Sequence, residues 1–172
     1  MIRHLFVLVG LIIITSCKSD TKSKLNIKDD SVEDQMLDRQ AKAFQKTLID
    51  YRGINEQFTE SYQIKGFGIQ KNKNNLIGFV FKLDSNSTES TVLKYSLGIR
   101  IYDRTLSGPR NMSFNPTITE KGSNKYIIVE KKIDDMTYFD SISVYIYKRK
   151  DWKGSGRLGG FMVRDILFKD KK

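Results

Sequence analysis

The chain has 172 residues and a mass of 19.9 kDa, which is the size of one domain. It is basic, since 30 Lys and Arg residues against 20 Asp and Glu residues give a formal net charge of +10. The single histidine, His4, and the single cysteine, Cys17, both lie within residues 1–17. Residues 18–172 therefore exclude disulfide scaffolds, Cys/His zinc sites, nucleophile systems that use histidine, and haem ligated by histidine.

Residues 1–16 have the pattern of a secretory signal peptide. Arg3 supplies a positive charge, and residues 5–14 form the uninterrupted apolar run LFVLVGLIII. A helix needs about 20 apolar residues to span the hydrocarbon core of a bilayer, so this run is too short for a transmembrane helix. The pattern predicts a cleaved leader.

The end of this leader, Ile14-Thr15-Ser16-Cys17, has an aliphatic residue, two small residues and a cysteine. It resembles the lipobox of bacterial lipoproteins. The resemblance implies that signal peptidase II cleaves before Cys17 and that Cys17 then carries a diacylglyceryl thioether and an N-acyl chain. Two or more acyl chains anchor a protein stably, since each buried methylene contributes about 0.8 kcal/mol. An ordinary secretory leader with an unmodified cysteine is the alternative.

The location follows from the same resemblance. The composition, rich in Lys, Asn and Ile, resembles lipoproteins of Bacteroidota, and Lys18 is not the Asp that retains enterobacterial lipoproteins in the inner membrane. We therefore expect a lipid-anchored protein on the periplasmic face of the outer membrane. Residues 17–29 are predicted to be the acylated cysteine and a flexible polar tether.

Residues 30–172 are predicted to form a single globular domain that begins with an amphipathic helix over residues 32–52. Asp30 suits the N-cap, Glu33 has the capping-box spacing, and Gly53 suits the position after the helix. A helix that lies on a membrane or binds a partner is the alternative, but acidic residues dilute its basic face, and we favour a helix packed on its own domain. The apolar positions recur at helical spacing and are Leu37, Ala41, Phe44, Leu48 and Tyr51.

Residues 62–168 alternate between apolar and polar side chains, which is typical of strands with one buried face. No βαβ alternation is present, so the predicted fold class is mainly β, an antiparallel β-sandwich of Ig-like or related type. A small barrel of lipocalin type is the alternative. The predicted strands are residues 62–70, 76–83, 92–102, 126–133, 139–147 and 161–168, with an irregular strand near residues 117–119.

Two motifs with a possible chemical meaning have simpler structural interpretations. Residues 154–159, GSGRLG, match G-x-G-x-x-G, but the segment that follows them is predicted to be a strand and not a helix, which indicates a glycine-rich hairpin loop. Asp134 and Asp135 form the obvious pair of carboxylates, yet neighbours in a strand or turn point apart, which favours a turn. We therefore predict no catalytic residue, no metal ligand and no cofactor, and a carboxylate-dependent hydrolase is the least favoured function.

The positive charge is concentrated near the C-terminus, where residues 148–172 contain nine basic and three acidic residues. Strand alternation places Tyr145 and Tyr147 opposite Ile146. This pattern predicts a basic aromatic surface that binds an anionic polymer, lipid headgroups or an acidic protein. A solvated sheet edge whose lysines prevent edge-to-edge pairing is the alternative. The candidate binding residues are Tyr145, Tyr147, Lys148, Arg149, Lys150, Trp152, Lys153 and Arg157.

These features together predict a membrane-anchored, non-enzymatic lipoprotein of the bacterial envelope that binds or scaffolds a partner. The expected partners are the membrane, through the lipid anchor, and an anionic envelope polymer or a protein. Nucleic acid fits the charge but not the compartment. The alternative function is a lipocalin-like carrier of a small apolar ligand.

Overall fold

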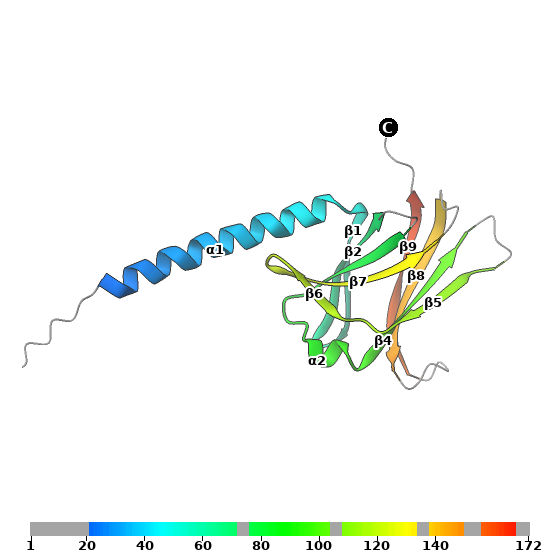
Figure 1. Ribbon diagram of the computed structural model, residues 1–172. Helices are drawn as coiled ribbons and strands as arrows, with labels where there is room; N and C mark the ends of the chain where they lie inside the picture. Colours follow the sequence, from blue (N-terminus) through cyan, green and yellow to red (C-terminus); the bar gives the residue numbers. More distant parts are fainter. Residues whose placement is uncertain (1–20, 72–75, 104–107, 134–137, 150–155, 168–172) are drawn as a thin grey trace, which may run out of the picture. The chain divides into compact units, whose positions relative to one another are not determined.

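The computed structural model describes residues 21–71, 76–103, 108–133, 138–149 and 156–167 (Figure 1). The chain divides into two units, Met1–Glu33 and Asp34–Lys172, and every strand lies in the second unit. The elements in chain order are α1 (Thr21–Lys46), β1 (Ile49–Thr59), β2 (Tyr62–Lys71), β3 (Leu76–Leu83), α2 (Glu89–Val92), β4 (Tyr95–Tyr102), β5 (Arg110–Phe114), β6 (Ile118–Lys121), β7 (Asn124–Lys132), β8 (Tyr138–Lys148) and β9 (Arg157–Leu167).

The strands form two separate antiparallel sheets (Figure 1). Sheet A has the order β1-β2-β3-β7-β6, and sheet B has the order β5-β4-β8-β9. The chain thus crosses between the sheets three times: β1 to β3 lie in sheet A, β4 and β5 in sheet B, β6 and β7 in sheet A, and β8 and β9 in sheet B. The predicted mainly-β antiparallel sandwich is confirmed, and the described strands do not close into one barrel.

The apolar interior lies between the two sheets and follows from the alternation of the strands. Phe79 and Phe81 of β3 point inward and are 0% exposed, as are Leu97 and Ile99 of β4. Phe67 of β2 packs against Phe81 with ring centres 5.3 Å apart. Side chains from both sheets therefore fill the space between them. Other members of this core are Tyr62, Ile64, Ile69, Ile77, Ile101, Ile127, Ile142, Val144, Ile146, Val163 and Ile166.

The C-terminal part of α1, residues 34–46, belongs to the second unit and packs on the outer face of sheet A. Ala41 is 1% exposed, and Phe44 packs edge-on against Tyr126 of β7 with ring centres 4.9 Å apart. Asp38 and Lys42 are both largely exposed and form an ion pair at 3.0 Å on the solvent side of the helix. The predicted helix with one apolar face is thus packed on its own domain.

The chain that follows α1 extends the same apolar layer. Leu48 and Tyr51 lie against Gly66 and Gly68 of β2. A Cβ atom on Gly66 would overlap the Tyr51 ring, and one on Gly68 would come within 3.1 Å of Leu48 Cδ1. The two glycines therefore provide the space that these larger side chains occupy.

The bounds of the first elements differ from the prediction. Helix α1 begins at Thr21, within the predicted tether, and ends at Lys46, whereas the helix was predicted over residues 32–52. Residues 49–52 begin strand β1, and Gly53 lies inside that strand. The apolar spacing continues past the helix because Leu48 and Tyr51 reach the same face of sheet A from an extended backbone. Strand β5, which was not predicted, is one edge of sheet B. The strand predicted over residues 92–102 begins only at Tyr95, because Val92 ends the short helix α2.

Arg52 joins the edge strands of the two sheets. Its guanidinium group donates to both carboxylate oxygens of Asp50, from Nε at 2.9 Å and from Nη2 at 2.8 Å. The same group also donates to the backbone carbonyls of Arg164 and Asp165 in β9. Asp50 and Asp165 both have positive φ angles, 51° and 54°, at these points. The contact links β1 to β9 and closes one side of the sandwich.

Gly122, in the turn between β6 and β7, permits the close approach of α1, and this generates a prediction. Its φ is +60°, and a Cβ atom there would overlap the Leu37 carbonyl oxygen and come within 2.7 Å of Ala41 N. We expect Gly122→Ala to lower the free energy of unfolding by at least about 1–2 kcal/mol, the cost of a left-handed conformation for a residue with a Cβ. Urea unfolding measures this difference.

The matched control is Gly53→Ala, because a Cβ on Gly53 would have nothing within 4 Å. This control should change the free energy of unfolding by less than about 0.5 kcal/mol. Equal stabilities of the two variants would contradict the proposed contact between the turn and α1.

Candidate functional site

The outer face of sheet B carries side chains in aligned rows. Leu97, Ile99, Val144 and Ile146 face the interior, so the residues between them point outward. Strand pairing places the outward residues of β5, β4, β8 and β9 beside one another. We call them the sheet B platform, which has four rows. The first row is Ser96, Tyr147 and Arg157, and the second is Ser113, Gly98, Tyr145 and Gly160. The third row is Asn111, Arg100, Ser143 and Met162, and the fourth is Tyr102, Ser141 and Arg164.

The Tyr145 ring lies over a glycine of the neighbouring strand. Gly98 and Tyr145 are directly paired between β4 and β8. A Cβ atom on Gly98 would overlap the Tyr145 ring, so the ring occupies the space of the missing side chain. Covering a strand glycine with a cross-strand aromatic ring shields the exposed backbone. Gly98 therefore determines where the ring of Tyr145 lies.

Tyr147 supports Tyr145 from the next row. The two rings are stacked, with centres 5.8 Å apart and planes inclined by 29°. The Tyr147 hydroxyl shares a hydrogen bond with the Ser113 hydroxyl of β5. Only 7% of the Tyr147 surface is exposed, whereas Tyr145 is half-buried. Tyr147 is thus a fixed neighbour of the more accessible Tyr145 ring.

Arg157 is held over the same ring. Its Cζ atom lies 5.6 Å from the centre of the Tyr145 ring, in the geometry of a cation–π interaction. One of its Nη atoms is 3.1 Å from the position that a Cβ on Gly160 would take. Gly160 is paired with Tyr145, and a Cβ there would overlap the backbone carbonyl oxygen of Val144, so this glycine mainly permits the close approach of β8 and β9. The guanidinium group lies beside the same position.

Arg100 is a second positioned cation on this face. It is exposed, and its Nε donates to Asn111 Oδ1 at 2.7 Å across the β4–β5 pair. This bond uses one of the five N–H donors of a guanidinium group. The platform also contains exposed Arg164, while none of the residues that define it carries a carboxylate. Its electrostatic character is therefore positive, and its hydroxyl and amide groups supply further hydrogen bonds.

The structure brings together three of the predicted binding residues. Tyr145, Tyr147 and Arg157 lie on the platform, and exposed Lys148 and Arg149 follow at the end of β8. Cys17, Lys150, Trp152 and Lys153 lie outside the described residues.

The contribution of β4 and β5 to the platform was not predicted from the sequence. Alternation in residues 92–102 already placed Arg100 on the polar face of its strand. Nothing local, however, indicated that this strand pairs with β8 and with Asn111 and Ser113 of β5.

The two motifs with a chemical interpretation do not form a site among the described residues. Asp134 and Asp135 lie outside them, as do Gly154 and Ser155. Gly156 is in a turn, and Arg157 begins strand β9. The element after the glycine-rich segment is thus a strand, as predicted, whereas a dinucleotide-binding motif requires a helix there.

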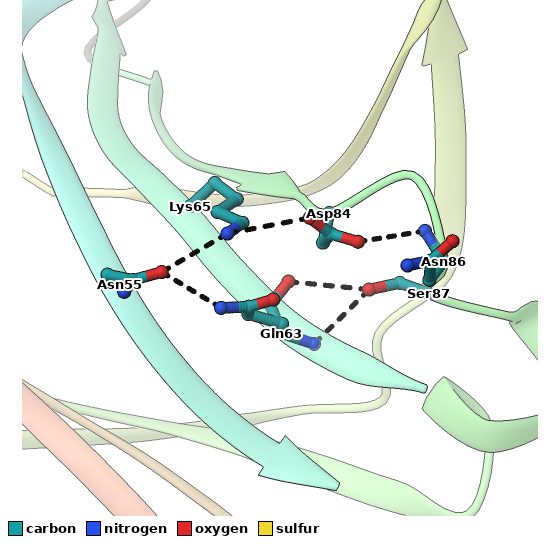
Figure 2. Close-up of polar contacts among 6 residues, drawn as sticks. All are labelled: Asn55, Gln63, Lys65, Asp84, Asn86 and Ser87. Carbon is teal, nitrogen blue, oxygen red and sulfur yellow. Dashed lines mark hydrogen bonds and ion pairs between the residues drawn. The ribbon is translucent and has the colours of Figure 1, made fainter. Parts of the chain in front are cut away.

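A second polar cluster lies on sheet A and is structural (Figure 2). Lys65 Nζ is 3.2 Å from Asn55 Oδ1 and 3.6 Å from Asp84 Oδ2. The Ser87 hydroxyl is buried and bonds both the N–H and the carbonyl of Gln63. These bonds hold the turn after β3 against β2. The polar groups of the cluster thus bind one another.

A displaced pKa often marks a catalytic group. Among the described residues, the side chains whose pKa is raised are packed tyrosines. Burial raises the pKa of Tyr62 in the core between the sheets, and of Tyr51 and Tyr126 in the layer beneath α1. The described residues contain no group of three His, Cys, Asp or Glu side chains that could hold a metal ion. Across the same residues, no helix has the length and apolar character needed to cross a bilayer.

Comparison with protein-family models, with curated proteins and with solved structures finds no match to this chain. Its function must therefore be inferred from its own residues.

The role of Gly98 generates a prediction. Gly98→Ala should displace the Tyr145 ring and disrupt its stack on Tyr147, because the added Cβ would overlap the ring. We expect the near-UV circular dichroism of the tyrosines to change while the far-UV spectrum is retained.

The control for this prediction is Gly78→Ala in β3. A Cβ on Gly78 would make an ordinary contact at 3.4 Å with Gln70 Cβ, so the near-UV spectrum should remain that of the unaltered protein. An unaltered near-UV spectrum in Gly98→Ala as well would show that Gly98 does not position Tyr145.

Proposed function

We propose that this protein is a lipid-anchored binding module of the bacterial envelope whose sheet B platform binds an anionic partner without chemical turnover. The observation that carries the proposal is the arrangement of Arg157 and Arg100. Arg157 lies 5.6 Å from the centre of the Tyr145 ring, and Arg100 is bonded to Asn111 at 2.7 Å. Cations held in place lose little conformational freedom when they bind an anion, which favours affinity.

The surroundings of these cations support binding rather than chemistry. The platform offers guanidinium, phenol, hydroxyl and amide groups, which can bind an anion but include no carboxylate or imidazole to act as a general base. A carrier of apolar ligands would need space between the sheets, where Phe67, Phe79 and Phe81 pack tightly with 0% exposure. We therefore place the binding function on the outer surface.

The anchoring part of the proposal rests on the lipobox-like residues that end at Cys17. Cys17→Ser removes the thiol that would carry the diacylglyceryl group. We expect this variant to move from the membrane fraction to the soluble fraction of the cells. Fractionation followed by immunoblotting measures the distribution, and mass spectrometry of the mature N-terminus identifies the acyl chains. Retention of Cys17→Ser in the membrane fraction would contradict the lipid anchor.

The binding part is tested with polyphosphate, a soluble polyanion without sugar units. The double variant Arg100→Gln/Arg157→Gln should bind polyphosphate at least about tenfold more weakly, since each charge-assisted hydrogen bond contributes about 1.5–3 kcal/mol. Its affinity should also depend less steeply on salt. Isothermal titration calorimetry at several salt concentrations measures both effects.

A variant of equal charge provides the control for this experiment. Lys46→Gln/Lys131→Gln removes two exposed cations from α1 and β7, outside the platform. It should retain the affinity for polyphosphate within about twofold, because surface charges that make no contact act weakly through screened solvent. Equal losses in the two double variants would mean that net charge, and not the platform, binds the polymer.

A further inference from the structure

We infer that the partner of the sheet B platform is an acidic polysaccharide, bound as an extended chain across the strands from Arg157, past Tyr145, to Arg100. This inference rests on the proposed function and narrows it to one chemical class. Three features of the platform carry it: the separation of the cations, the ring between them, and the polar groups beside them.

The two positioned cations are too far apart for one anionic group. Arg157 lies on β9 and Arg100 on β4, with β8 between them. Two strand spacings amount to about 10 Å, and adjacent rows on one face are about 7 Å apart. Arg157 leans toward the row of Gly160, while Arg100 is bonded to Asn111 on the far side of β4, in the next row. Their guanidinium groups thus lie about 10 Å apart or more.

This separation argues for a polymer with repeated charges. A single phosphate or carboxylate can contact one of these guanidinium groups but cannot bridge both. A chain that carries a charge on successive units can contact both at once, and the second contact then benefits from the high effective concentration created by the first. Exposed Arg164, in a further row of β9, offers a third contact for a longer chain.

The groups beside the two cations suit sugars. Tyr145 projects from β8, between the strands that carry Arg157 and Arg100, and its ring lies over Gly98. The part of the ring that Gly98 and Arg157 leave exposed can contact the apolar C–H face of a sugar. Exposed Ser113 and Asn111 lie on β5, beside β4, where Ser113 pairs with Gly98 and Asn111 pairs with Arg100, and their polar groups can bond sugar hydroxyls. An acidic protein would instead bind best through buried apolar anchors in a pocket. A membrane surface would need protruding apolar groups, and Met162, at 47% exposure, is the one large aliphatic side chain of the platform.

The experiment titrates the full acylated chain, in nonionic detergent, with oligogalacturonates of increasing length. We expect the affinity to rise at least about tenfold from the monosaccharide to the longer chains, because only these reach from Arg157 to Arg100. Glycerol phosphate, a lipid headgroup, should bind as weakly as the monosaccharide. Oligoglutamate and oligothymidylate of matched charge should bind about tenfold more weakly than the matched oligogalacturonate. An affinity independent of chain length, or tighter binding of either of the two other polymers, would overturn the inference.

A pair of variants separates sugar contact from charge. Tyr145→Leu removes the aromatic ring and retains every cation, and it should weaken oligogalacturonate binding about fivefold or more. Polyphosphate binding should weaken less, because polyphosphate loses only the positioning of Arg157 over the ring. Tyr145→Phe retains the ring and should bind like the unaltered protein. Oligogalacturonate binding that is unaffected in Tyr145→Leu would contradict the role of the ring.

The two proposals fail in different ways. If polyphosphate does not bind through Arg100 and Arg157, the proposed function is wrong. If polyphosphate binds through these arginines but oligogalacturonates show no dependence on length or on Tyr145, only the assignment to acidic polysaccharides is wrong.

Discussion

The apolar interface between the two sheets is the constraint on which the rest of the molecule depends. Phe67, Phe79 and Phe81 of sheet A meet aliphatic side chains of sheet B such as Leu97 and Ile99 in a fully buried layer. Because side chains alternate along a strand, burying one face of each sheet necessarily presents every second residue on an outer face. The sandwich therefore has two outer faces. Side chains and α1 cover part of the face on sheet A, whereas the face on sheet B carries the platform.

Glycines on both outer faces make room for larger side chains, but the side chains that fill this space are apolar packing groups on sheet A and part of the candidate binding site on sheet B. On sheet A, Gly66 and Gly68 accommodate Tyr51 and Leu48, and the C-terminal part of α1 packs over the same face. On sheet B, Gly98 accommodates the ring of Tyr145, and the guanidinium group of Arg157 lies over that ring, beside Gly160. The first arrangement adds a second apolar layer. The second positions a cation and an aromatic ring on a face whose defining residues include no carboxylate, which is the physical basis of the proposed binding site.

The strands that the sequence did not predict, β1 and β5, lie at sheet edges, and this has a physical reason. Strand β1 contains register irregularities in its pairing with β2, which break the regular alternation, and its Arg52 is used to join β9. Strand β5 is short and exposed, so it has few buried positions from which alternation could be recognised. By contrast, the central strand β3 was predicted with the observed bounds, because burial on its inner face makes the pattern unambiguous.

Local patterns in the sequence were sufficient to predict a mainly-β sandwich, a helix with one apolar face, and the outward orientation of Tyr145 and Tyr147, since each depends on the spacing of nearby residues. The same is true of the leader and the lipobox-like motif, whose interpretation remains a prediction. Only the tertiary structure decided that Gly98 lies beneath Tyr145, that Arg157 lies over it, and that Asn111 positions Arg100. These neighbours are 11 to 47 residues apart in the chain and meet through strand register, which the pairing of whole strands determines and no short segment encodes.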